Sequence, residues 1–184
     1  MNKHIEFGTV ARRELVKGID ELADAVVATL GPNGRNVVIS NNQGVPQSTK
    51  DGVTVAKSIA LKEPTQELGV QLLKQAAINT ANKAGDGTTT STLLAREIIK
   101  AGLNSLDNGE NAVKIKREID IAVTTTINNL RDKISEDITG EAQLEQIASI
   151  SANNDPEIGK LISTAIDKVG LDGVVHIEES KIRR

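Results

Sequence analysis

Apolar residues recur along most of the chain with the three- and four-residue spacing of amphipathic helices. The first stripe consists of Leu15, Ile19, Leu22, Val26 and Leu30, and the sequence Leu30-Gly31-Pro32 then predicts the end of that helix. Similar stripes predict further helices over residues 52–59, about 65–84, 88 to near 102, 115–130, 144–148 and 156–169. Because the 65–84 helix is apolar over a wide arc, we expect it to be largely buried.

Three short segments have the pattern of β-strands instead. His4 to Phe7 alternates polar and apolar residues, and Val174 to Ile177 is a β-branched run. Between them, residues 37–39 and 45–49 flank the turn-forming sequence 41–44 and predict a hairpin, with Pro46 marking an edge strand. The predicted fold class is therefore mostly α with a small β-hairpin and edge strands (α+β).

Composition excludes several classes of function. Phe7 is the only aromatic residue and the formal net charge is −3, so neither base stacking nor an electrostatic nucleic-acid interface is expected. The absence of cysteine excludes disulfides and thiol catalysis. No stretch has the length of a membrane span, and the first residues lack the apolar block of a secretory signal. We therefore expect a cytoplasmic protein with neither nucleic-acid nor membrane partners.

The strongest candidate for chemistry is the segment from Gly85 to Thr92, which lies between two predicted helices. Glycines allow a ligand to approach the backbone, and the free amides of a helix N-terminus favour phosphate. Asp86 would repel phosphate by itself, so it is better understood as a ligand of Mg²⁺ that bridges phosphate oxygens. The alternative is an ordinary helix start capped by Asp or Thr, and the segment alone leaves both interpretations open. The Walker A motif is absent.

Two other turns could complete a phosphate site. Residues 29–32, Thr-Leu-Gly-Pro, offer backbone groups at the end of the first helix. Residues 50–52, Lys-Asp-Gly, offer a cation, a carboxylate and a flexible joint. Taken singly, each is more simply explained as a cap or a turn.

Four segments together resemble the group I, GroEL-type, chaperonins. They are TLGPNGRNVV at 29–38, TKDGVTVA at 49–56, AGDGTTT at 84–90 and ISAN at 150–153. Their order and spacing match that family, and the resemblance extends from about residue 5 to residue 178. It implies that residues 1–133 form the N-terminal part of an equatorial ATP-binding domain. Residues 134–184 would then be the first segment of an intermediate domain and the start of the strand that leads to an apical domain absent from this chain.

The resemblance also implies a site. It indicates ATP with Mg²⁺ and K⁺ as cofactors, Asp86 as the metal ligand, and Asp51 as a candidate catalytic residue close to the γ-phosphate. The residues implied to bind the cofactors are Thr29, Leu30, Gly31, Pro32, Lys50, Asp86, Gly87, Thr88, Thr89, Thr90, Ile150 and Asn153. The water-activating aspartate of the family lies in a part of the fold that this sequence does not contain.

The function implied by the resemblance is that of an ATP-dependent chaperone. Its subunits would form a homo-oligomeric ring, with client proteins and a co-chaperonin lid bound through absent regions. The predicted hairpin would contact a neighbouring subunit. The alternative is a chaperonin remnant that keeps a partial nucleotide site without folding clients. We expect the 184-residue chain by itself to hydrolyse ATP poorly and to be marginally folded, because the apolar stripes at 15–30 and 115–130 would need partners from the absent half of the equatorial domain.

Overall fold

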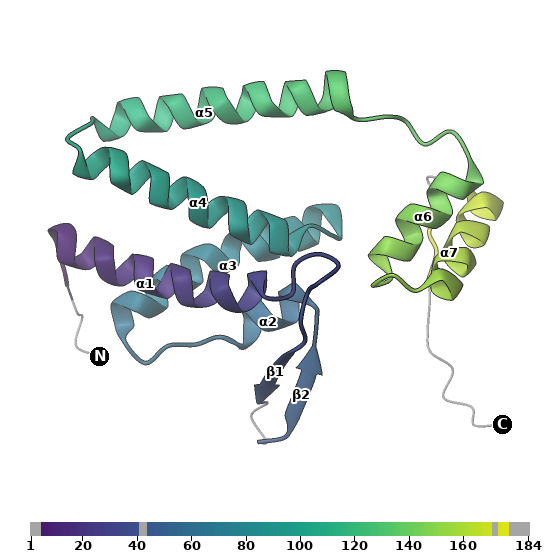
Figure 1. The fold of residues 1–184 in the computed structure, drawn as a ribbon, viewed down its shortest axis with the longest axis horizontal. Helices are drawn as coiled ribbons and strands as arrows, with labels where there is room; N and C mark the ends of the chain where they lie inside the picture. The colour runs from purple at the N-terminus through teal and green to yellow at the C-terminus, as the bar shows by residue number, and fades with distance from the viewer. Residues whose placement is uncertain (1–4, 41–43, 171–172, 177–184) are drawn as a thin grey trace. The chain divides into compact units, whose positions relative to one another are not determined.

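The structure is a computed structural model that describes residues 5–40, 44–170 and 173–176. The chain forms two compact units, one up to Val123 and one from Thr124 onward. The first unit contains α1 (Gly8–Val27), β1 (Val37–Ser40), β2 (Pro46–Thr49), α2 (Gly52–Ser58), α3 (Pro64–Ala84) and α4 (Thr88–Asp107). The next helix, α5 (Ala112–Asn129), begins in the first unit and ends in the second. The fold is predominantly helical, as predicted (Figure 1).

The first unit is built on close contact between α1 and α3. Gly18 of α1 lies against the carbonyl of Gln66, where a Cβ atom would come within 1.8 Å of the oxygen. Gly69 of α3 lies in the same way against the carbonyl of Leu15, at 2.1 Å. Glycine at both positions therefore lets the two backbones approach. The core beside this contact consists of Ile19, Leu22, Ala23, Val26, Val55, Ala56, Val70, Leu73 and Ala77.

Helices α2 and α4 close this core from other sides, and both also contact α3. Thr92 of α4 is fully buried, and its hydroxyl donates to the carbonyl of Thr88 one turn earlier. Among the described residues, three ion pairs join α4 to α1: Arg96 with Asp24 at 2.6 Å, Lys100 with Asp20 at 3.1 Å, and Asp107 with Arg12 at 3.9 Å. These ion pairs hold α4 against α1.

The predicted hairpin is present. Strands β1 and β2 pair antiparallel, with Val37 opposite Thr49 and Ser40 opposite Pro46. Within the described residues the sheet has only these two strands. The predicted turn at 41–44 lies mostly outside the described residues.

The second unit contains the end of α5, the π-helical turn η1 (Leu130–Ile134), α6 (Glu141–Ser151) and α7 (Pro156–Val169). Helices α6 and α7 pack through small residues, because Gly159 lies against Ser149 and Ser163 is fully buried. Asp155 caps α7 by accepting from the amides of Glu157 and Ile158, with Pro156 at the first helical position. This is the helix start that the Asp-Pro sequence predicted.

Several predicted boundaries were wrong. The segment 5–7 and the segment 174–176 are not strands, because neither has a neighbouring strand to pair with in the described residues, and Ile177 lies outside them. Helix α1 ends at Val27 rather than at Leu30, since Thr29 and Leu30 already form turn hydrogen bonds to Val26 and Val27. Helix α4 continues past Gly102 to Asp107, because a glycine weakens a helix without ending it.

The expected burial of two helices also needs correction. Helix α3 is buried on one face only: Val70, Leu73 and Ala77 lie in the core, whereas Leu68 and Leu72 are 60% and 55% exposed. We expected α1 to need partners from outside the chain, but most of its stripe is buried here against α3 and α4. The stripe on α5 agrees better with that expectation, since only Ile115 is buried.

Candidate functional site

The segment from Gly85 to Thr90 forms a tight connection between α3 and α4. Gly85 at the end of α3 and Gly87 at the start of α4 have φ angles of 74° and 82°, a left-handed conformation that glycine adopts without strain. No side chain caps the N-terminus of α4. The first helical hydrogen bond of α4 runs from the amide of Ser91 to the carbonyl of Gly87, so the amides of Thr88, Thr89 and Thr90 precede the helical hydrogen bonds.

Asp86 projects from this connection and is exposed. Its Oδ1 atom accepts from the amide of Gly87 at 2.6 Å, and its other oxygen has no partner among the described residues. Asp86 is therefore not the cap of α4, and neither is a threonine, because the N-cap residue is Gly87. Of the two interpretations left open by the sequence, the capped helix start is wrong. An exposed carboxylate beside unpaired amides is the arrangement that the phosphate interpretation requires.

The turn at residues 29–32 lies against the start of α4. The hydroxyl of Thr29 donates to the carbonyl of Val26 at 2.7 Å and lies 3.4 Å from the hydroxyl of Thr89. Gly31 has a φ angle of 73°. Gly34 folds back on the turn so closely that a Cβ atom there would lie 2.2 Å from the carbonyl oxygen of Thr29. The Thr29 turn is thus held in one place by its own backbone and by α4.

The third segment, residues 50–52, reaches the same threonine. A Cβ atom on Gly52 would lie 2.5 Å from Thr89 Oγ1, so the first residue of α2 has to be small. Lys50 is exposed and makes no ion pair within the described part of the chain. Three segments far apart in sequence therefore meet around Thr89: the Thr29 turn, the start of α2 and the start of α4.

Asp51 has a structural role that the sequence suggested. It caps α2: Oδ1 accepts from the amide of Val53 at 3.2 Å, and Oδ2 accepts from the amide and hydroxyl of Thr54 at 2.9 and 2.5 Å. Burial opposes ionisation of Asp51, but these hydrogen bonds and the charge of Lys57 outweigh it and lower its pKa. A carboxylate used in this way is ionised and fixed in orientation.

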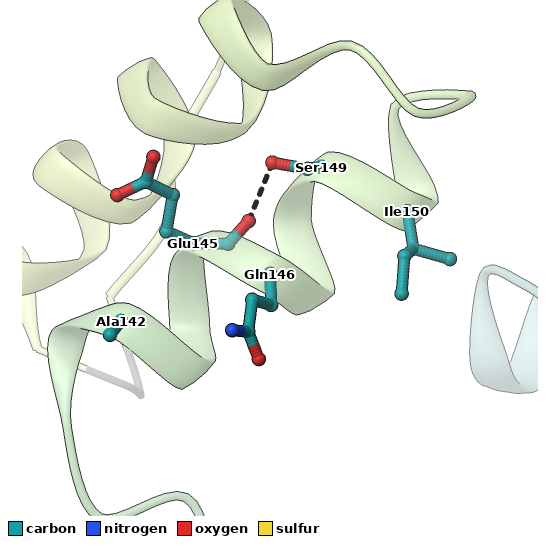
Figure 2. A pocket seen from close by; sticks show the side chains of 5 residues that line it. All are labelled: Ala142, Glu145, Gln146, Ser149 and Ile150. Atoms are coloured by element: carbon teal, nitrogen blue, oxygen red, sulfur yellow. Dashed lines mark hydrogen bonds between the residues drawn. The ribbon is translucent and has the colours of Figure 1, made fainter.

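Ile150 and Asn153 belong to the second unit, and their assignment to a nucleotide site stays a prediction. Ile150 is 63% exposed near the end of α6, where it lines a shallow depression (Figure 2). The side chains around this depression all come from α6: Ala142, Glu145, Gln146, Ser149 and Ile150. Asn153 and Asn154 follow with φ angles of 59° and 63°, a left-handed turn that asparagine tolerates better than most residues.

Sequence reasoning missed the tight contacts behind the site. Gly34 was noted only as part of a motif and Gly52 only as a flexible joint, although each lies against a residue of the candidate site. It also missed Lys74, a lysine on the apolar face of α3 that is only 9% exposed. The sequence did contain a signal for it: Lys74 occupies a position on the apolar stripe of α3 where a core residue would be expected.

The described residues contain no cluster of three or more histidine, aspartate or glutamate side chains that could hold a metal by themselves. None of the described helices is long and apolar enough to cross a membrane.

The fold of the chain is similar to that of known chaperonins. Two crystal structures of the chaperonin gp146 from the bacteriophage EL 2 (Pseudomonas aeruginosa), both in the presence of ATP-BeFx, are similar to the chain. One has a TM-score of 0.74 and 30% identity over 90% of the chain, and the other a TM-score of 0.73 and 31% identity over 88%. A group III chaperonin in the open state, at 22% identity over 86% of this chain and 32% of its own, shares the fold with a TM-score of 0.72.

The family match covers most of the sequence. Residues 22–183 match the TCP-1/cpn60 chaperonin family. The chain therefore belongs to that family. It spans 29% and 28% of the length of the two phage chaperonin structures, so the activities of whole chaperonins are carried to it below only as proposals.

Proposed function

We propose that this chain forms the phosphate-binding part of the ATP site of a chaperonin subunit of the group I type. The observation that carries the proposal is the meeting of three segments at Thr89, beside open helix amides and the exposed carboxylate of Asp86. Membership of the chaperonin family and similarity to structures obtained with ATP-BeFx support it. ATP-driven folding of client proteins in a homo-oligomeric ring is the function we propose for the complete subunit.

Each segment has a role in this proposal. The amides of Thr88 to Thr90, at the positive end of a helix of 20 residues, would hold phosphate oxygens. The Thr29 turn would contribute backbone groups, and a bound K⁺ would balance part of the phosphate charge. Lys50 and Asp51 would face the terminal phosphate, with Asp51 kept ionised by its hydrogen bonds.

Asp86 fits a bound Mg²⁺ better than it fits any structural role. It is exposed, one oxygen has no partner in the described residues, and it caps no helix. When bound, the ion would neutralise phosphate charge, which is much of what phosphoryl transfer requires. Asp86 would then orient the ion, and the fixed glycines on both sides would keep the carboxylate in place.

The proposal is tested by the binding of ATP to the purified chain, with and without Mg²⁺, measured by calorimetry. We expect Mg²⁺ to strengthen ATP binding in the wild type and Asp86→Ala to abolish that effect. Because Asp86 caps no helix, the melting temperature should stay within about 2 °C of wild type, the change expected for a surface substitution. In a complete subunit the same substitution should slow hydrolysis by about 10²- to 10³-fold, by analogy with loss of one oriented electrostatic group.

Asp167→Asn is the matched control, since it removes an exposed carboxylate of α7 in the second unit. It should leave both the melting temperature and the effect of Mg²⁺ unchanged. Asp86→Ala that melts well below wild type but binds MgATP normally would contradict the assignment of Asp86 as a metal ligand.

A further inference from the structure

Lys74 is a buried cation in the first unit that the proposed site does not use. It lies on the core-facing side of α3 beside Val70, Leu73 and Ala77 and is 9% exposed. A buried ammonium group destabilises a fold unless it has partners. The Nζ atom of Lys74 donates to the carbonyl of Ile59 and, at 3.5 Å, to that of Lys57. These carbonyls lie at the C-terminal end of α2, where a positive charge is favourable.

Glu67 holds the segment that connects α2 to α3, just after the residues that Lys74 binds. It precedes Lys74 on α3 by seven residues, about two helical turns. Its Oε2 atom accepts from the amide of Leu61 at 2.7 Å, and this hydrogen bond is the largest cause of the lowered pKa of Glu67. The side chains of Ile59 and Leu61 pack against the core. Two opposite charges on α3 therefore bind a carbonyl and an amide of the segment leaving α2, and we call this pair the α2–α3 clamp.

The clamp lies between two parts of the proposed site. Helix α2 begins after Asp51, and α3 ends at Ala84, directly before Gly85 and Asp86. A helix of seven residues has little stability of its own, so its position depends on what holds its two ends. At its first residue α2 contacts Thr89, and at its last it is held by Lys74.

We propose that Lys74 and Glu67 are positioning residues that fix Lys50 and Asp51 relative to Asp86. The inference rests on the proposed function, because it concerns the placement of groups around the terminal phosphate. Neither residue is among those proposed above to contact the nucleotide. The clamp acts by preventing α2 from sliding or fraying at its C-terminal end, which would move the Lys50-Asp51 turn. Such small displacements cost a binding or reacting site far more than they cost the fold.

The test compares Lys74→Met, which keeps the apolar stem and removes the ammonium, with Lys74→Arg, which keeps the charge. Lys62→Met is the matched control, because Lys62 is exposed in the same connection. Hydrogen exchange of the α2 amides and the affinities for MgATP and MgADP are measured at a temperature where every variant is folded. Lys74→Met should speed α2 exchange about tenfold, the loss expected for a hydrogen bond to a charged group.

Comparing the affinities for MgATP and MgADP distinguishes a role in positioning Lys50 and Asp51 from a general role in stabilising the fold. Lys74→Met should weaken MgATP about tenfold but MgADP less than about threefold, because only ATP has the terminal phosphate that Lys50 and Asp51 would face. Lys74→Arg should recover most of the ATP affinity, and Lys62→Met should behave as wild type. Equal weakening of both nucleotides, or unchanged exchange in α2, would overturn the inference.

A second variant covers the case in which Lys74→Met does not fold. Glu67→Gln leaves the hydrogen bonds of Lys74 in place and weakens the hold on Leu61, together with the exposed hydrogen bond from Gln71. It should give the same pattern with a smaller amplitude. If the wild type binds neither nucleotide, the proposed function fails. The exchange of α2 then still decides whether the clamp holds that helix.

Discussion

Replacing Gly52 by alanine tests whether α2 and α4 meet at the candidate site as closely as the structure has them. The added Cβ atom would lie 2.5 Å from Thr89 Oγ1 and 3.5 Å from Val26 Cγ1. The first distance is well inside van der Waals contact. Thr89 must therefore rotate its hydroxyl away, or α2 must move away from α4, and either change disturbs the contact between Thr89 and Thr29.

The magnitude follows from two opposing effects. Helix propensity favours alanine over glycine by up to about 1 kcal/mol. Overpacking a buried position typically costs about 1–3 kcal/mol. Since the obstacle at Gly52 is the end of a side chain, we expect a net loss of about 1 kcal/mol in the free energy of unfolding. Gly52→Ala should also lower the affinity for ATP about tenfold relative to wild type, because the hydroxyl of Thr89 leaves the site.

Gly102→Ala is the matched control for this experiment. It also lies within a helix, but a Cβ atom there would meet Ile115 Cγ2 at 3.8 Å and Ile119 Cδ1 at 3.9 Å, which is ordinary contact. We expect Gly102→Ala to raise the free energy of unfolding by up to about 1 kcal/mol and to leave ATP binding unchanged. Urea denaturation and calorimetry on the same preparations measure both quantities.

A third variant identifies the clashing atom. Adding Thr89→Ala to Gly52→Ala removes the hydroxyl, so it should restore most of the lost stability but not the ATP affinity. The reasoning is refuted if Gly52→Ala stabilises the chain as much as Gly102→Ala does and binds ATP like wild type.

Two further predictions concern the turns that complete the site. Asp51→Ala should lower the free energy of unfolding by about 1 kcal/mol by removing the cap of α2, whereas Asp51→Asn should lose much less at neutral pH. Because the pKa of Asp51 is lowered in the fold, its contribution is full above the ordinary value near ~4 and is lost as the pH falls through the folded pKa. The stability difference between wild type and Asp51→Ala should therefore shrink in urea titrations below about pH 4, and a difference independent of pH would contradict the ionised cap. In Gly34→Ala the added Cβ atom would lie 2.2 Å from a backbone carbonyl oxygen, which cannot move aside as a side chain can. The substitution should therefore lower the free energy of unfolding by about 2 kcal/mol or more and abolish ATP binding. A fully stable Gly34→Ala would show that the Thr29 turn is not held as described.

The local features of this fold could be predicted from the sequence. The periodic stripes identified the long helices, the β-branched run identified β1, and Asp155-Pro156 identified the start of α7. Each of these signals acts within a few residues: a helical face, a cap or a turn. The glycines at 85 and 87 likewise indicated a break between two helices, because their backbone conformation is a local property.

The resemblance to group I chaperonins named the residues of the candidate site, and membership of the broader TCP-1/cpn60 chaperonin family is confirmed. What neither stripe nor motif could decide is how those residues meet. Two apolar faces were available on α3, and the face that became buried is the one α1 and α2 cover. Thr89 contacts both Thr29 and Gly52. In the sequence, Thr29 precedes Thr89 by 60 residues (89 − 29) and Gly52 precedes it by 37 (89 − 52).

Lys74 shows the same limit most clearly. In the sequence Lys74 is a charged residue that interrupts the apolar stripe of an amphipathic helix, and nothing local explains it. In the fold it binds carbonyls of another helix, and those carbonyls are free only because α2 ends at Ser58 and the chain leaves it extended. The sequence determines where helices begin, end and carry apolar residues. Tertiary packing alone decides which polar groups lose water and must find one another, because burial depends on neighbours that are distant along the chain.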